Sequence, residues 1–463
     1  MLQEHDTIAA IATSMGNSGI HIIRISGLDS FDVISRVFKK GKKCIDFHPE
    51  KYDSHTIHYG FIYDGDMCID EVLVSVFKSP NSFTSENTVE VNCHGGSYVV
   101  QRILELIINK GARLAMPGEF SKRAFLNGRI DLTQAEAVMN IINSKNEISL
   151  NASIKQIKGD VKNVISSIRN VILTHIANIE ATLDDPEHYS FDDDFLNILG
   201  TDVNKIIEDI NVICNNSKNG IIVSEGIKTV IVGKPNVGKS SLMNYILKDD
   251  KAIVTNIPGT TRDVIEYSVN LANVTLNLVD TAGIHDTSDM IEQLGIDRTK
   301  EYIENADLIL CVFDMSDFSS EDDVKIYNSI VDKNHLCIFN KCDLEKCDDS
   351  FYLDIINNDN SIMFSAKEKI GYDELVNQIN NMFYNNVLDI ENEIFITNVR
   401  HMELLNNAIH SLSCVIENID AFATEDILTI DLLDAYNYLG EIIGETIDDD
   451  VVDKIFSDFC MGK

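Results

Sequence analysis

The chain has 463 residues, 44% of them hydrophobic, which is enough for about three domains that each bury their own core. No apolar run approaches the roughly 18 residues of a membrane span, and the first residues, MLQEHDTIAA, lack a secretion signal pattern. Ten cysteines at irregular spacing, without a CxxC pair, predict reduced thiols and a cytoplasmic protein. The net charge of −36 repels phosphate backbones. It either serves solubility alone or means that tight nucleic-acid binding is supplied largely by a basic partner.

Residues 1–118 are expected to form an α+β domain. Short β-rich runs (DTIAAIAT, GIHIIRISG, DEVLVSVF and NTVEVNCHG) surround one helical segment, YVVQRILELIINKG, which Gly111 should end. From 119 to 219 the pattern becomes helical, and LTQAEAVMNII starts with Thr133 and Glu136 at capping-box spacing. The acidic stretch DDPEHYSFDDDF, residues 184–195, is predicted to be a solvated connection between helices.

Residues 220–384 alternate strands and helices, the pattern of a parallel α/β sheet. Residues 385–463 are helical again and finish in FCMGK. A helical region that is split around an α/β segment predicts that the α/β domain is inserted into a helical domain. The expected fold class is therefore multidomain α/β.

The segment KTVIVGKPNVGKSSLMNYIL carries the P-loop spacing G-x-x-x-x-G-K-[ST] between an apolar strand and a helix. The glycines permit a tight loop whose N–H groups wrap phosphates, and the helix N-terminus favours their negative charge. We expect Lys239 to neutralise the β- and γ-phosphates and Ser240 to bind Mg²⁺. The predicted contacts with the nucleotide from this loop are Asn236, Val237, Gly238, Lys239, Ser240 and Ser241.

Base specificity is predicted from the sequence NKCD at 340–343, with Asn340, Lys341 and Asp343 as contacts. The Asp343 carboxylate can accept hydrogen bonds from guanine N1–H and the 2-amino group, which adenine lacks. A second motif, Ser365, Ala366 and Lys367, matches the loop that supports guanine. Together with DTAG (Asp280, Thr281, Ala282 and Gly283), the order of these motifs predicts a Ras-like P-loop GTPase domain.

The residue after DTAG is Ile284, where many GTPases carry a water-positioning glutamine. Isoleucine cannot orient water, so the transition state needs an arginine finger or a cation. Asn236 could ligate a monovalent cation, and Thr261 could bind Mg²⁺. The cation cage would be completed by the loop Thr255, Asn256, Ile257, Pro258, Gly259, Thr260 and Thr261. Glu292 is a candidate to align water, although its surroundings in the sequence alone favour a solvated surface carboxylate.

Three further stretches narrow the family: PNSFTSENTVEVNCHGG, PGEFSKRAFLNGRIDLTQAEAV and the terminal FCMGK. With the GTPase motifs they resemble the MnmE (TrmE) family of tRNA modification GTPases over essentially the whole chain. The resemblance implies a homodimer joined through N-terminal domains that bind 5-formyltetrahydrofolate or a related tetrahydrofolate. It also implies a heterotetramer with the FAD protein MnmG (GidA), which installs an aminomethyl or carboxymethylaminomethyl group at carbon 5 of the tRNA wobble uridine. GTP hydrolysis in this family depends on K⁺.

The resemblance also implies residue roles. The K⁺ ligands would be the Asn236 side chain and backbone oxygens of Thr255, Ile257 and Thr260, while Ser240 and Thr261 hold Mg²⁺. Glu292 would act in catalysis through water. The implied folate contacts are Arg24, Glu90, Arg129 and Lys463; without the resemblance, Arg24 and Glu90 would be interpreted as charges on a strand surface.

Some positions depart from the family pattern. Met461 replaces the usual isoleucine of the tail, and His285 replaces an arginine, which puts a charge contact of the switch region in doubt. Cys460 is a candidate catalytic residue that the family places near the folate. Its other interpretations are a small apolar residue or a lipidation site, and C-M-G-K is a poor prenylation box. Cys93 and His94 are adjacent without a second metal-binding pair, so packing in a turn is favoured.

The main alternative function is a ribosome-assembly GTPase that acts as a binding switch. Such a protein should carry a basic RNA-binding segment after the GTPase domain, and no basic cluster follows it here. The GTPase domain of a membrane iron transporter is a third class, which the missing membrane spans disfavour.

Overall fold

The computed structural model describes residues 6–184, 194–248, 254–256, 266–271, 274–279, 302–316, 320–344, 355, 360–384, 396, 398–421, 424–447, 449–457, 459 and 462. Its contacts divide the chain into two compact units. The first unit consists of Met1–Met139, Gln156–Asn170 and Tyr436–Lys463, and the second of Asn140–Lys155 and Val171–Ala435. The helical part of the chain is thus shared between the units, because α6 (Asp160–Asp184) and α14 (Glu425–Ile443) have residues in both.

The first unit is built on a sheet of eight strands in the order β4-β3-β5-β6-β7-β2-β1-β8. All neighbours pair antiparallel except β1 and β8, which are parallel. The strands are β1 (Ile8–Ile11), β2 (Ile20–Ser26), β3 (Phe38–Lys40), β4 (Ile45–Asp46), β5 (Thr56–Asp64), β6 (Met67–Phe77), β7 (Thr88–His94) and β8 (Arg113–Leu114). The four β-rich runs of the sequence correspond to β1, β2, β6 and β7.

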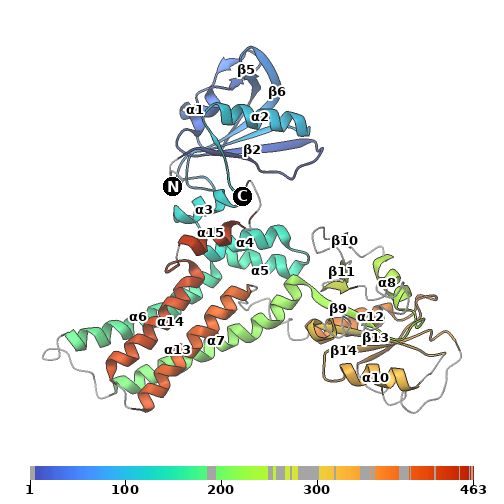
Figure 1. Ribbon diagram of the computed structural model, residues 1–463. Coiled ribbons are helices and arrows are strands. Elements are labelled where there is room, and N and C mark those ends of the chain that lie inside the picture. The colour runs from blue at the N-terminus through green and yellow to red at the C-terminus, as the bar shows by residue number, and fades with distance from the viewer. Residues whose placement is uncertain are drawn as a thin grey trace. The chain divides into compact units, whose positions relative to one another are not determined.

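Helix α2 (Ser97–Asn109) lies across this sheet (Figure 1). Its buried residues Val100, Ile103, Leu106 and Ile107 recur at helical spacing and join the core of the sheet. Gly111 follows with φ +119°, a conformation that favours glycine, and the helix ends as predicted. The other short helices of this unit are α1 (Ser30–Ser35), the 3₁₀ turn η1 (Pro49–Lys51), α3 (Glu119–Leu126) and α15 (Asp449–Ser457).

Helix α4 (Leu132–Asn143) begins with a capping box that differs from the predicted one. Asp131 Oδ1 accepts from the N–H of Gln134 at 3.0 Å, and Gln134 Oε1 accepts from the N–H of Asp131 at 3.0 Å. The prediction of Thr133 and Glu136 as the box was wrong by two positions. Both spacings occur in the sequence, but Thr133 lies inside α4, where its hydroxyl donates to Asp131 Oδ1 at 2.5 Å.

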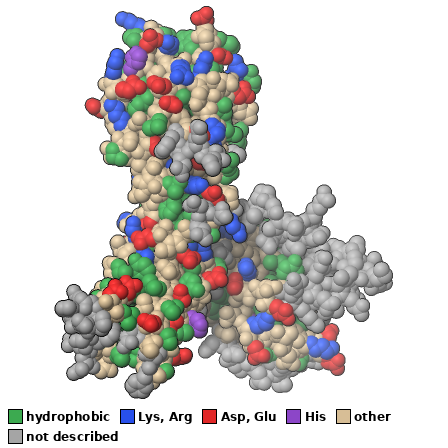
Figure 2. Space-filling view, turned by 60° about the vertical axis from the view of Figure 1, so that its left-hand side comes forward, with side chains coloured by type: hydrophobic (Ala, Val, Ile, Leu, Met, Phe, Trp, Pro, Cys, Tyr) green, Lys and Arg blue, Asp and Glu red, His purple; other side chains and the backbone are tan. Residues whose placement is uncertain are grey.

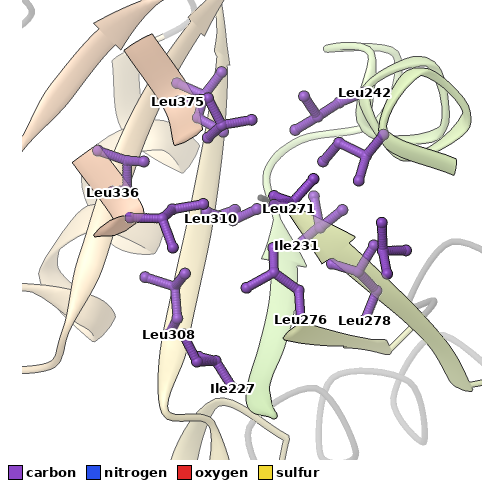
Figure 3. Packing of buried hydrophobic residues seen from close by; sticks show 14 of the residues in the cluster. Ile227, Ile231, Leu242, Leu271, Leu276, Leu278, Leu308, Leu310, Leu336 and Leu375 are labelled. Atoms are coloured by element: carbon purple, nitrogen blue, oxygen red, sulfur yellow. The ribbon is translucent and has the colours of Figure 1, made fainter. Parts of the chain in front are cut away.

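The second unit contains a sheet of seven strands in the order β10-β11-β12-β9-β13-β14-β15. Five strands, β12, β9, β13, β14 and β15, are parallel to one another. The other two, β10 and β11, form antiparallel pairs at one edge. The strands are β9 (Ile227–Val232), β10 (Val254–Asn256), β11 (Glu266–Leu271), β12 (Val274–Val279), β13 (Leu308–Asp314), β14 (His335–Asn340) and β15 (Ser361–Met363). Figure 3 shows the apolar side chains that fill one face, among them Leu310, Leu336 and Leu375.

Helices cover both faces of this sheet, as in α/β proteins with buried parallel strands. Residues of α8 (Lys239–Lys248) and α12 (Tyr372–Tyr384) join the core drawn in Figure 3, and α10 (Ser320–Ile330) packs on the opposite face. The remaining helices are α5 (Glu147–Ile157), α7 (Phe195–Glu225) and α13 (Val399–Asp420). Among the described residues, no helix combines the length and apolarity needed to cross a membrane.

The architecture confirms the predicted fold class, with an N-terminal α+β domain, a helical region and an α/β domain with a largely parallel sheet. The acidic connection predicted at 184–195 falls mostly on residues 185–193, which lie outside the described residues.

Candidate functional site

The predicted P-loop joins β9 to α8 at the carboxyl end of a central strand. Two of its glycines cannot be replaced without movement. A Cβ on Gly233 (φ +148°) would lie 2.4 Å from the carbonyl oxygen of Val312, and one on Gly238 (φ +101°) would lie 2.1 Å from Nδ2 of Asn340. The glycines therefore serve close packing of the loop against β13 and β14 as well as its turn.

Lys239 begins α8 and turns its side chain back over the loop. Its Nζ donates to the carbonyl oxygens of Gly233 and Lys234, both at 2.7 Å. Burial lowers the pKa of the Lys239 ammonium, while the nearby Cys311 opposes that shift. The positively charged ammonium group of Lys239 thus lies within the curve of the loop, where the sequence predicts that phosphate binds.

Asn340 connects the P-loop to the two predicted base-recognition motifs. Its Nδ2 donates to the carbonyl oxygen of Val237 at 2.8 Å, and its Oδ1 accepts from the N–H of Ala366 at 3.3 Å. The adjacent Lys341, at φ +62°, donates to Asp314 Oδ2 at 2.5 Å and to the carbonyl oxygen of Asn236 at 3.2 Å. These bonds bring together loops that lie more than 100 residues apart in the chain.

The charges around these loops favour ionised carboxylates. Burial raises the pKa of Asp314, but hydrogen bonds from Lys341 and Ser316 outweigh burial and leave it below its usual value. Ser365 Oγ donates to Asp343 Oδ1 at 2.6 Å, and this bond is the largest cause of the lowered pKa of Asp343. Asp343 is therefore an acceptor at neutral pH, the state that recognition of guanine N–H groups requires. Of the other predicted base contacts, Lys367 is well exposed.

Asn236 adopts φ +65°, which asparagine tolerates better than most residues. Its side chain is exposed and has no hydrogen-bond partner within the part of the chain that the structure describes. Ser240 and Ser241 are exposed in the first turn of α8, and the backbone of Thr255 and Asn256 belongs to β10. Several predicted residues lie outside the described residues: Ile257, Pro258, Gly259, Thr260, Thr261, Asp280, Thr281, Ala282, Gly283, Ile284, His285, Glu292, Cys460, Met461 and Lys463.

A second cluster lies on the sheet of the first unit. Arg24 in β2 is directly opposite Glu90 in β7, and their side chains form an ion pair of 2.9 Å. Arg24 Nη1 also donates to the carbonyl oxygen of Gly462, 438 positions later in the chain, at 3.3 Å. The Arg24 side chain is only 17% exposed. Two of the predicted folate residues and the end of the chain thus meet at one guanidinium group.

Arg129 joins the same cluster through an aromatic ring. The guanidinium carbons of Arg24 and Arg129 lie 5.7 and 5.4 Å from the centre of the Phe83 ring, and Phe120 lies 5.6 Å from Arg24. Phe83 and Phe120 were not among the predicted site residues. Phe83 belongs to the stretch PNSFTSENT, so an aromatic residue within a family motif was the available signal.

The tail reaches this cluster through contacts that only glycine permits. Gly462 has φ +85°, and a Cβ there would lie 2.4 Å from the carbonyl oxygen of Ile11. Nearer the body of α15, a Cβ on Gly118 (φ +67°) would lie 2.3 Å from the carbonyl oxygen of Phe456. Backbone therefore packs on backbone at both positions.

Cys93 and His94 have separate surroundings. Burial raises the pKa of the Cys93 thiol to about 11. His94 is exposed, and its Nδ1 lies 2.6 Å from Asp70 Oδ1, a hydrogen bond that raises the pKa of the imidazole. The prediction of packing in a turn was wrong, because both residues belong to β7, and their side chains point to opposite faces of the strand as successive residues do.

Comparison with known proteins identifies the family. The model described as "GTP-binding protein TrmE N-terminus" matches residues 7–129, and the model described as "MnmE helical domain" matches residues 132–460. The chain is 45% identical to proteins named tRNA modification GTPase MnmE from Lachnoclostridium phytofermentans and Thermoanaerobacter pseudethanolicus, over 99% of this chain and of each relative. The relative of the same name from Bacillus mycoides is 43% identical over 99% of this chain and 100% of its own. Because these matches span the whole length, and not the nucleotide domain alone, the chain belongs to the MnmE family of tRNA modification GTPases and hydrolyses GTP in tRNA modification.

Proposed function

We propose that this GTPase depends on potassium and works with the FAD protein MnmG to modify carbon 5 of the tRNA wobble uridine. The group installed is aminomethyl or carboxymethylaminomethyl, and its one-carbon unit comes from a tetrahydrofolate. The proposed domains are an N-terminal folate-binding and dimerisation domain (1–118), a GTPase domain (220–384), and a helical domain formed by 119–219 and 385–463. We place the activity in the cytoplasm.

The observation that carries the proposal is the cluster of Arg24, Glu90 and Arg129 around Phe83, with the carbonyl oxygen of Gly462 bonded to Arg24. Its chemistry fits a tetrahydrofolate. A carboxylate suits the amino-pyrimidine edge of a pterin, an aromatic ring can stack on the heterocycle, and guanidinium groups suit the anionic glutamate tail. Glu90 would hold the pterin, Arg129 and Lys463 would bind the anionic end, and Arg24 would orient the Glu90 carboxylate. When bound, the folate supplies the carbon that is transferred.

The nucleotide half of the proposal uses the loops joined by Asn340. Lys239 has three N–H donors, so it would bind the β- and γ-phosphates from the position that its bonds to the two loop carbonyl oxygens give it. Asp343 accepts the N–H groups of guanine, which favours GTP over ATP. Ser240 and Thr261 would hold Mg²⁺, which neutralises charge on the phosphates.

K⁺ would supply the positive charge that an arginine finger supplies in other GTPases. The exposed amide of Asn236 supports this assignment, because it belongs to the phosphate loop itself. The remaining ligands would be backbone oxygens of Thr255, Ile257 and Thr260. Glu292 would align the attacking water through a second water, replacing the glutamine that Ile284 excludes.

The N-terminal sheet supports a homodimer. Helix α2 covers one face of the sheet, and the other face presents apolar side chains to solvent, including Ile57, which is 67% exposed, and Leu73, which is 45% exposed. Burial of this face against a second copy would remove that apolar surface from water.

A basic partner explains how so acidic a chain acts on tRNA. On the coloured part of the face drawn in Figure 2, Lys and Arg side chains alternate with Asp and Glu rather than forming one continuous basic patch. With a net charge of −36, the chain would bind tRNA mainly through MnmG in the heterotetramer.

The proposal is tested in two assays. Mass spectrometry of tRNA nucleosides from a deletion strain should show loss of the modified wobble uridine, with recovery on complementation. Unchanged nucleosides would contradict the proposed reaction. In the second assay, purified protein should hydrolyse GTP much faster in K⁺ than in Na⁺, and Asn236→Ala should lose that preference. Equal rates of the wild type in both salts would contradict the cation mechanism.

A further inference from the structure

The P-loop contains a second lysine, Lys234, whose side chain points away from the loop. Its Nζ lies 2.6 Å from Oδ2 of Asp323 in the first turn of α10. The Lys234 side chain is 12% exposed and that of Asp323 is 2% exposed, so this is a buried ion pair. The neighbouring acids of that turn, Glu321 and Asp322, are exposed.

The backbone of Lys234 takes part in a different contact. Its carbonyl oxygen accepts a hydrogen bond from Nζ of Lys239, 2.7 Å away, and the carbonyl oxygen of Gly233 accepts a second one. Lys234 therefore links two elements: its side chain binds Asp323 of α10, and its carbonyl oxygen binds the ammonium group of Lys239. A displacement of Lys234 would move a group that defines where Lys239 lies.

Helix α10 is held against the sheet by apolar packing. Ile330 is fully buried in the core on its face of the sheet, together with Cys311 and Phe339. Because the carboxylate of Asp323 is buried, separating it from Lys234 would leave two charges without their closest counter-charge in a poorly solvated place. The pair therefore resists separation, and α10 restrains the loop.

We propose that Asp323 and Lys234 are positioning residues for GTP hydrolysis. Through their ion pair, α10 holds the P-loop in the shape that presents Lys239 to the β- and γ-phosphates. The proposal rests on the assignment of residues 233–240 as the phosphate site. Neither side chain contacts the reacting atoms; both act through the position of Lys239.

The test compares two substitutions in the same turn of α10. Asp323→Asn removes the buried partner of Lys234. Asp322→Asn removes an exposed carboxylate that pairs with Lys325 at 3.3 Å, where the side chains are 66% and 72% exposed. The variants are made in the full chain, and kcat is measured at saturating GTP in K⁺ per molecule that binds GDP. That normalisation removes any loss that comes only from unfolded protein.

We expect Asp323→Asn to lower kcat by between about tenfold and 10²-fold, the range that a small displacement of a catalytic group produces. The affinity for GDP should fall by a smaller factor than kcat, because GDP lacks the γ-phosphate on which Lys239 acts during hydrolysis. Asp322→Asn should retain the wild-type kcat. Lys234→Arg keeps a cation within reach of Asp323 and should recover most of the activity that Lys234→Met loses.

Equal kcat values for Asp323→Asn and Asp322→Asn would overturn the proposal. If the single variants do not fold, the double variant Lys234→Met/Asp323→Leu removes both charges together and avoids an unpaired buried charge. A kcat within about twofold of the wild type in this folded double variant would also overturn it, since a lost link should cost tenfold or more. Lys239→Ala distinguishes failure of the positioning role from failure of the phosphate site on which it rests. Normal GTP hydrolysis by that variant would refute the phosphate site itself.

Discussion

The substitution Gly462→Ala tests whether the end of the chain belongs to the folate site. The new Cβ would lie 2.4 Å from the carbonyl oxygen of Ile11 and 2.8 Å from Cα of Ala12. Ordinary contacts between such atoms are about 3.5 Å, so the tail must withdraw by roughly 1 Å. The bond from Arg24 to the Gly462 carbonyl oxygen is already 3.3 Å long, and this displacement would break it.

The size of the effect follows from two contributions. Losing a hydrogen bond to a charged group costs about 1.5–3 kcal/mol. Holding alanine at φ +85° costs about 1–2 kcal/mol more. Together they predict a loss of about 2.5–5 kcal/mol in docking of the tail, which corresponds to folate binding weakened by roughly 60- to 4,000-fold.

Calorimetric titration of 5-formyltetrahydrofolate into the full-length variant measures this loss. Gly65→Ala is the matched control, because Gly65 also has a positive φ, +61°, but a Cβ there meets no atom within 4 Å. The control shares the backbone strain without the clash. GTP hydrolysis should survive in both variants, since no nucleotide-binding residue is changed. Equal folate affinity in the two variants would refute the role of the tail.

Three further predictions concern single side chains. Asp343→Asn should weaken GTP binding severely and favour xanthosine triphosphate, measured by fluorescent nucleotide titration; unchanged GTP affinity would exclude Asp343 from base recognition. Glu292→Ala should lower kcat by about 10²-fold and leave GTP affinity nearly intact, whereas near-normal turnover would make Glu292 an ordinary surface charge. Native protein treated with iodoacetamide at pH 8 should be alkylated at the exposed Cys68 and spared at Cys311 and Cys337. Burial raises the pKa of Cys311 far above its usual value and that of Cys337 to about 12, so both stay neutral thiols; rapid alkylation of either, read by mass spectrometry, would contradict their burial.

Much of the nucleotide site could be predicted from local sequence, because its requirements act over a few adjacent residues. A phosphate loop needs glycine where a Cβ would strike the next strand, as at Gly233 and Gly238, and a lysine at the start of the helix that follows. Hydrophobic spacing likewise predicted α2 and its end at Gly111. The start of α4 was misplaced, because two pairs in the sequence have capping-box spacing and the local sequence does not decide which of them caps the helix.

Other features were decided by tertiary structure alone. Nothing near Arg24 in the sequence indicates that Phe83 lies beside it, and nothing near Lys234 points to Asp323. The approach of Gly462 to Arg24 was expected only from the family resemblance, which implies Arg24 and Lys463 as contacts of one folate. The first turn of α10 contains three acidic residues, Glu321, Asp322 and Asp323, and the sequence does not show which of them is buried. The orientation of the helix on the sheet buries Asp323 and leaves the other two exposed. Such pairs form because the packing of whole elements brings distant residues together. A local pattern records which face of a helix or strand is apolar, but it does not record which residue of another element that face will meet.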